Sequence, residues 1–182
     1  NADLWTLVLG IFTLLIVSST IGYLLQRRLP AGQSNAAIEN LNARIKAWWI
    51  MAILIGLAFL AGRIGVLLLF GFCSFAALRE FITLTDTKRA DHWALAAAFF
   101  VVLPVHYVLL GTLWYGLFAI FIPVYAFLIL PAVATLTGDV NEFLARSARV
   151  QWGLMLTVYS ISHAPALLML DTGVPGALLI VY

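Results

Sequence analysis

Residues 4–26 read LWTLVLGIFTLLIVSSTIGYLLQ, and this apolar stretch decides the class of fold. A helix needs about 20 mostly apolar residues to cross the hydrocarbon core of a bilayer. The whole chain of 182 residues has the same character, with 64% hydrophobic residues, 10% charged residues and a mean hydropathy of +1.05. Soluble domains carry about 25% charged residues. We therefore expect an integral membrane protein.

Further apolar runs of this kind occupy residues 48–62, 64–80, 93–111, 113–136 and 152–170. Before the second run, apolar residues recur at spacings of three and four, at Ile38, Leu41, Ile45 and Trp48. This spacing predicts an amphipathic helix over residues 34–47 that lies on the bilayer surface. The expected fold is all-α, a polytopic membrane helix bundle in a single transmembrane domain over residues 1–182.

The predicted bundle has six full transmembrane helices plus the start of a seventh, with the interfacial amphipathic helix. The seventh run, residues 176–182, would reach only about 10 Å as a helix, whereas the hydrocarbon core is about 30 Å thick. A helix that ends inside lipid leaves carbonyl groups without partners. We therefore expect the polypeptide to continue beyond Tyr182.

The placement of the basic residues predicts the orientation. With the N-terminus outside, nine of the ten Lys and Arg residues fall on the inner side. They are Arg27, Arg28, Arg44, Lys46, Arg79, Lys88, Arg89, Arg146 and Arg149. Basic residues concentrate on the cytoplasmic side of membrane proteins, so we expect the N-terminus outside. The net charge of +2 gives no reason to expect nucleic acid as a partner.

Two polar groups within the spans are candidate substrate-binding residues. Arg79 and Glu80 end the third run, and Glu80 is preceded at helical spacing by small residues that permit close helix packing. They form either a polar site or a charged span end that faces water. Ser160 and His163 belong to a polar stripe on the sixth run. This stripe either joins helices by hydrogen bonds or lines a hydrated cavity, because polar groups are costly in lipid.

Other polar residues favour structural roles. The apolar neighbours of His106 indicate a packed histidine that bonds another helix. Asp139 and Glu142 have the spacing of a helix N-cap residue and the third residue of the same helix. They fit a pair of Mg²⁺ ligands less well. Lys88 and Arg89 either bind phosphates or mark the membrane boundary. Neither a cluster of metal ligands nor a complete catalytic motif occurs in the sequence.

The residues RIKAWWIMAILIGLAFLAGRIGVLLLFGFCSFAALREFITL (44–84) and WGLMLTVYSISHAPALLML (152–170) resemble the bacterial phosphatidate cytidylyltransferase, or CDP-diacylglycerol synthase, family. The resemblance covers essentially the whole chain. It implies a multi-pass enzyme of the bacterial cytoplasmic (inner) membrane that makes CDP-diacylglycerol from CTP and phosphatidic acid with Mg²⁺. The Lys-, Arg-, Asp- and Gly-rich signature that holds the metals in this family is not in this sequence, so no catalytic residue is carried over.

The resemblance leaves two functions open. One is a cytidylyltransferase, to which this chain contributes the lipid-facing scaffold and part of the cavity. The alternative is a non-catalytic membrane scaffold, or a subunit of a larger membrane complex, that uses the bundle for packing alone. The phospholipid membrane is a partner in both cases. Phosphatidic acid and CTP are partners of the enzyme only, and a homodimer or a larger complex is compatible with either.

Overall fold

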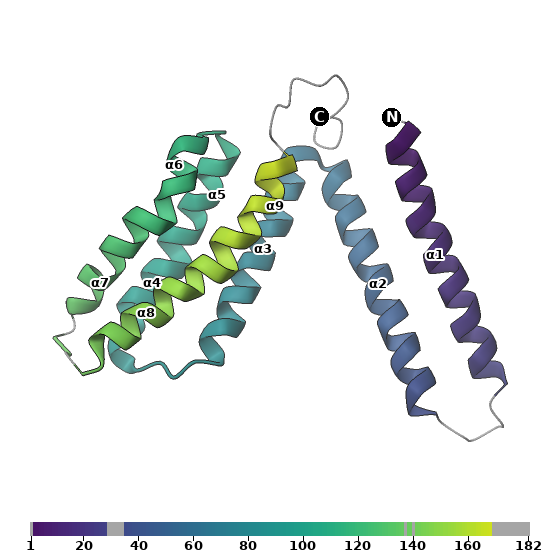
Figure 1. Cartoon of the computed structure of the whole chain (residues 1–182), viewed down its shortest axis with the longest axis horizontal. Helices are drawn as coiled ribbons and strands as arrows, with labels where there is room; N and C mark the ends of the chain where they lie inside the picture. The colour runs from purple at the N-terminus through teal and green to yellow at the C-terminus, as the bar shows by residue number, and fades with distance from the viewer. Residues whose placement is uncertain (1, 29–34, 137, 140, 169–182) are drawn as a thin grey trace. The chain divides into compact units, whose positions relative to one another are not determined.

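The computed structural model describes residues 2–28, 35–136, 138–139 and 141–168, and every regular element in these ranges is a helix. Three helices are uninterrupted (Figure 1): α1 (Ala2–Arg27), α2 (Ala36–Leu60) and α3 (Gly62–Thr83). Three further rods each contain a π-helical segment between two α-helices. They comprise α4 (His92–Ala97), η2 (Ala98–Val102) and α5 (Leu103–Gly111); α6 (Tyr115–Ile120), η3 (Phe121–Ala126) and α7 (Phe127–Thr135); and α8 (Phe143–Gly153), η4 (Leu154–Tyr159) and α9 (Ser160–Leu168). A short 3₁₀ helix, η1 (Arg89–Asp91), precedes α4.

The all-helical fold class is confirmed for the described residues, while the number of spans is confirmed only in part. Within the described ranges, five helices are long and apolar enough to cross a membrane: Val8–Arg27, Ala36–Leu60, Gly62–Thr83, Arg89–Gly111 and Tyr115–Thr135. These helices indicate a multi-pass membrane protein. The sixth expected span, residues 152–170, falls largely on η4 and α9, but its last two residues lie outside the described ranges. The expected seventh helix also lies outside them.

Residues 1–57 form one compact unit, in which α1 and the first part of α2 make a hairpin. Trp49 Nε1 donates a hydrogen bond to Ser19 Oγ at 2.9 Å, and Asn42 Nδ2 donates to Gln26 Oε1 at 3.1 Å. A Cβ on Gly22 would lie 2.3 Å from Asn42 Oδ1, so a larger residue at this position would require the Asn42 side chain to shift. Residues 36–47, predicted as an interfacial helix, are instead the first half of the continuous helix α2. A separate amphipathic element is not confirmed.

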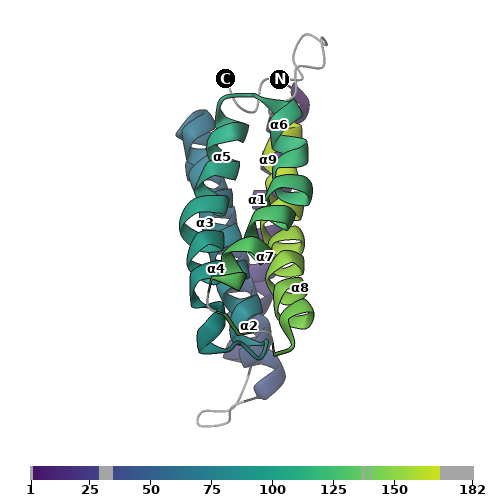
Figure 2. The same cartoon turned by 90° about the vertical axis from the view of Figure 1, so that its left-hand side faces the viewer.

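Residues 58–182 form the second unit. Its described part is a bundle of four rods, which are α3 and the three interrupted helices, and this bundle faces the viewer in Figure 2. Helix α3 packs on α5, η4 and α9, while α4 packs on α7, α5 on α6, and α7 on α8. Each rod thus has neighbours on two sides and the bundle closes around one core. Its fully buried apolar side chains come from all four rods: Val66, Leu78, Leu110, Ile122, Leu154 and Val158.

Two prolines in the α6–α7 rod determine how it attaches to the α8–α9 rod. A proline has no N–H to donate to the carbonyl four residues before it. Pro123 therefore frees the carbonyl of Ala119, and Tyr159 Oη donates to that oxygen at 3.0 Å. The second freed carbonyl, that of Phe127, lies four residues before Pro131 and accepts a hydrogen bond from Gln151 Nε2 at 2.8 Å. The two rods are thus joined by hydrogen bonds that the prolines make available.

Candidate functional site

A buried ion pair fixes the charged end of the four-rod bundle. Arg146 Nε donates to Asp91 Oδ1 at 2.6 Å, and the two side chains are 2% and 6% exposed. Asp91 Oδ2 accepts a second hydrogen bond from the backbone N–H of Lys88 at 2.9 Å, which closes η1. The carboxylate raises the pKa of the Arg146 guanidinium above its ordinary value, mainly through the direct hydrogen bond. This pair ties the start of α8 to the start of α4.

Arg146 also holds the connection between α7 and α8. Its Nη1 lies 3.1 Å from Asp139 Oδ2 and donates to the carbonyl of Asn141 at 3.1 Å. Asp139 Oδ1 accepts the Asn141 backbone N–H at 3.0 Å. That backbone hydrogen bond is the main reason why the pKa of Asp139 lies below its ordinary value. One arginine therefore organises both connections at this end of the bundle.

The predicted helix cap at this connection is wrong. Helix α8 begins at Phe143, and the residue before it, Glu142, has a left-handed backbone with φ 51° and makes no capping hydrogen bond through its side chain. The carboxylate of Asp139 closes a turn with Asn141 and faces the guanidinium of Arg146, so it is not available to cap the helix. The side chain of Glu142 pairs with Lys88 at 3.3 Å, where both groups are exposed.

Arg79 and Glu80 lie near the C-terminal end of α3, with both side chains exposed. Neither side chain has a hydrogen bond or ion pair within the described ranges. The face of α3 that packs in the bundle carries Val66, Ser74 and Leu78, so the seam does not follow the small residues that precede Glu80. The two charged groups are therefore free to meet a substrate or water, and their predicted role stays a prediction.

The polar stripe of the sixth predicted span divides into a buried and an exposed part. Ser160 is exposed, and its Oγ donates to the carbonyl of Met155 at 2.9 Å. His163 is half-buried, with Nδ1 2.6 Å from the carbonyl of Tyr159. Ser162, which the predicted stripe did not include, is fully buried and forms a hydrogen bond to another rod. The polar group in the core is thus Ser162, whereas the predicted candidates were Ser160 and His163.

The partner of Ser162 is His106, which confirms the prediction that this histidine bonds another helix. His106 Nε2 and Ser162 Oγ are 2.8 Å apart, and both residues are fully buried. Ser162 Oγ also lies 2.8 Å from the carbonyl oxygen of Tyr159 on its own rod. The ring also stacks on Phe118 with centroids 4.5 Å apart.

The structure does not bring the four predicted substrate-binding residues together. A Cβ on Gly153 would lie 3.4 Å from Leu78, so Gly153 is level with the residues just before Arg79 and Glu80. His163 lies ten residues further along the same rod, which corresponds to about 15 Å of helical rise. Arg79 and Glu80 thus belong to the charged end of the bundle, and Ser160 and His163 to its other half.

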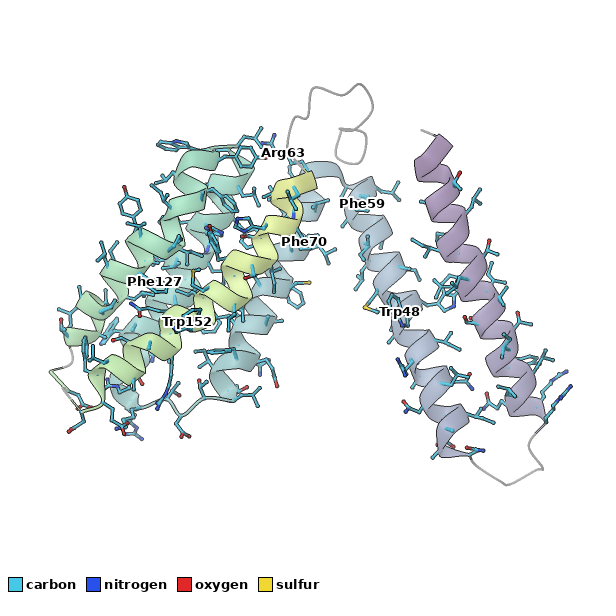
Figure 3. The ribbon with its side chains drawn as sticks, viewed as in Figure 1. Trp48, Phe59, Arg63, Phe70, Phe127 and Trp152 are labelled. Carbon is cyan, nitrogen blue, oxygen red and sulfur yellow. The ribbon has the colours of Figure 1, made fainter. Side chains whose placement is uncertain are left out.

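Further polar contacts of the bundle were not predicted from the sequence. Ser74 Oγ and Tyr107 Oη are 2.7 Å apart in the core, and Tyr107 also donates to the carbonyl of Phe70 at 2.9 Å. Arg63 donates to the carbonyl of Gly111 and so caps the end of α5. Arg63 and Phe70 are labelled in Figure 3, at the start and near the middle of α3. The partners in these contacts are 33 to 48 residues apart in sequence, so short-range spacing gives no signal for them.

The described residues do not fit the Mg²⁺ that the resemblance implies. No group of three or more His, Cys, Asp and Glu side chains that could hold a metal ion occurs within the described ranges. The carboxylates of Asp91 and Asp139 are already engaged, since both face the guanidinium of Arg146. We therefore derive no catalytic step through a metal ion from this part of the protein.

Comparison with known proteins identifies the family. Residues 42–182 match the model of the cytidylyltransferase family. An uncharacterized protein of Escherichia coli (strain K12), YnbB, is 34% identical over 176 residues, which are 94% of this chain and 55% of that protein. The chain thus spans about half the length of the curated relative it matches. No solved structure matches it significantly. The family match covers most of the chain, including all four rods of the bundle, and the protein belongs to the cytidylyltransferase family.

Proposed function

We propose that this protein is a membrane-embedded cytidylyltransferase that makes CDP-diacylglycerol from CTP and phosphatidic acid. The observation that carries the proposal is the family match over residues 42–182, which includes the charged end of the bundle. In this reaction a phosphate oxygen of phosphatidic acid attacks the α-phosphorus of CTP, and pyrophosphate leaves. Transfer of this kind depends on positioning and charge neutralisation more than on covalent chemistry by the protein.

The described rods would supply the lipid-facing scaffold and the charged end at which a soluble nucleotide meets a lipid. Arg79 is exposed at that end and has no carboxylate partner within the described ranges. Its planar guanidinium suits recognition of a phosphate, because two parallel N–H groups match two phosphate oxygens. Glu80, next to it, would orient the nucleotide or the lipid headgroup. The inner-membrane location, with the N-terminus outside, is part of this proposal.

The alternative of a non-catalytic scaffold is favoured by one observation. The buried polar side chains of the bundle form contacts between its rods, such as His106 with Ser162 and Asp91 with Arg146. Polar contacts of this kind hold membrane helices together. A scaffold or a subunit of a larger membrane complex would need these contacts and no others.

One experiment separates the two functions. The complete polypeptide that the gene encodes is placed in vesicles with phosphatidic acid, CTP labelled in the cytidine ring, and Mg²⁺. The enzyme should move label into the lipid phase and release one pyrophosphate for each labelled lipid. Label that stays in the aqueous phase, from protein that is folded and correctly inserted, would reject the enzyme and leave the scaffold.

A second arm tests the charged end. Arg79→Gln and Glu80→Gln should each lower turnover by about tenfold, the effect of losing about 1.4 kcal/mol of transition-state stabilisation. Glu142→Gln is the matched control, because its exposed pair with Lys88 contributes little. If the Arg79 and Glu80 variants turn over like the control, these two residues have no part in the reaction.

A further inference from the structure

Four basic side chains gather at one end of the α1–α2 hairpin. Arg27 and Arg28 end α1, and Arg44 and Lys46 lie in the first half of α2, and all four are exposed. The hydrogen bond from Asn42 to Gln26 brings the two pairs together, since it joins the residue before Arg27 to a residue two positions before Arg44. The hairpin geometry therefore makes one basic end from residues that are separated in sequence.

The register of the hairpin shows how far these charges are spread along the helix axis. Trp49 lies beside Ser19, and Asn42 beside Gln26, so the residue opposite Lys46 is Gly22. Gly22 precedes Arg27 by five residues, which is about 7 Å along the helix. The headgroup layer on each side of a bilayer is about 5–8 Å thick. The four charges thus span a depth that matches the layer in which lipid phosphates lie.

The basic end lacks acidic partners. Glu39 is its one described carboxylate, and no ion pair joins it to any of the four basic side chains in this part of the hairpin. Four positive charges and one negative charge leave a net charge of +3 (4 − 1 = 3). The guanidinium of Arg27 lies over the ring of Tyr23, 4.9 Å from its centroid. This contact occupies the face of the guanidinium and leaves its N–H edge free for an anion.

We propose that this end of the hairpin, made of Arg27, Arg28, Arg44 and Lys46, binds the phosphate groups of anionic phospholipids. The occupant is a lipid headgroup, because the charges extend over about the thickness of the headgroup layer and the apolar part of the hairpin continues directly beyond them. Each basic residue near an anionic surface strengthens binding by about fivefold. The site lies in a different unit from the charged end of the bundle, and it does not depend on the proposed reaction.

Photo-crosslinking of lipids tests this site. A benzoylphenylalanine replaces Ala43, which is exposed beside Arg44, in the complete polypeptide. The protein is placed in vesicles of equal amounts of phosphatidylglycerol and phosphatidylcholine, and mass spectrometry identifies the lipids joined to the probe. Phosphatidylglycerol should exceed phosphatidylcholine by about fivefold or more. The same probe at Leu14, an exposed residue in the apolar part of α1, should capture both lipids equally.

Charge variants show whether the basic residues cause the preference. Arg44→Gln with Lys46→Gln should lower the lipid ratio by about fivefold or more, while Arg44→Lys with Lys46→Arg should keep it. Excess inorganic phosphate at matched ionic strength should leave the ratio unchanged. If phosphate abolishes the preference for phosphatidylglycerol, the site takes free phosphate instead. Equal capture of the two lipids at Ala43, or a ratio that the double glutamine variant does not alter, would overturn the proposal.

Discussion

The hydrogen bond from Tyr159 to the carbonyl that Pro123 frees gives the sharpest test of how the bundle is held together. Tyr159→Phe removes only the hydroxyl that donates to Ala119 at 3.0 Å. In lipid the freed carbonyl has no water to replace that donor. An acceptor that faces lipid without a partner is costly, and hydrogen bonds between membrane helices reach about 1.7 kcal/mol. We expect a loss of about 1–2 kcal/mol in the free energy of unfolding.

The same reasoning predicts that this loss depends on the proline. Pro123→Ala restores a backbone N–H that can bond the Ala119 carbonyl within the rod, so Tyr159→Phe should cost little in that background. A double-mutant cycle, measured by equilibrium unfolding of the reconstituted protein, gives the coupling directly. We expect a coupling free energy of about 1 kcal/mol between the two positions. Additive effects would refute the idea that Tyr159 serves the carbonyl that Pro123 frees.

Three further predictions concern packing and charge. Gly153→Ala places a Cβ 2.9 Å from the ring of Phe81 and should lower the free energy of unfolding by about 1–3 kcal/mol, measured by equilibrium unfolding. Asp91→Asn leaves the buried guanidinium of Arg146 without its nearest charge partner and should lower the thermal unfolding midpoint. The pKa of Asp139 is below its ordinary value of 3.8, so its contribution to stability is complete above pH 3.8 and is lost as the pH falls through the lower value in the folded protein. Asp139→Asn should therefore flatten the pH dependence of unfolding below pH 3.8.

Matched variants make these predictions specific. Gly116→Ala is the control for Gly153, because a Cβ at Gly116 meets nothing within 4 Å. Glu142→Gln is the control for Asp91, because the Glu142 pair is exposed. If Gly153→Ala is as stable as Gly116→Ala, the Phe81 ring moves freely and the two rods are not closely packed there. If Asp91→Asn unfolds at the same temperature as Glu142→Gln, the buried pair does not stabilise the bundle.

The helices were predictable because the bilayer imposes their length. Runs of about 20 apolar residues separated by charged or glycine-containing connections have few other solutions in lipid. The break at Gly62, between α2 and α3, follows this rule, and its backbone has φ 68°, which glycine adopts readily. The extent of α2 was not predictable in this way. Its first half is amphipathic, and amphipathic spacing is equally compatible with a helix on the bilayer surface and with one that pairs with α1, as it does here.

The partners of buried polar groups were predictable in kind but not in identity. The apolar neighbours of His106 required a bond to another helix, and Ser162 provides it. Sequence spacing alone favoured Ser160 and His163, because it assumed an unbroken α-helical period. Segment η4 is π-helical, with the Ser160 backbone N–H bonded to the carbonyl five residues earlier, at Met155. A turn of this kind rotates the following side chains relative to those of an α-helix. The buried serine of this rod is Ser162, two positions after Ser160.

The same limit explains why the charged end was not predicted. Asp91 and Arg146 are 55 residues apart and lie in connections that the sequence marks only as polar. Charged residues in such connections usually face water, whereas here both side chains of the pair are buried. Through Nε and Nη1, the buried guanidinium of Arg146 binds Asp91, Asp139 and Asn141 together. Arg79 and Glu80, by contrast, are exposed at the same end of the bundle. Substituting these two residues therefore tests the proposed reaction, whereas substituting Asp91 tests the stability of the fold.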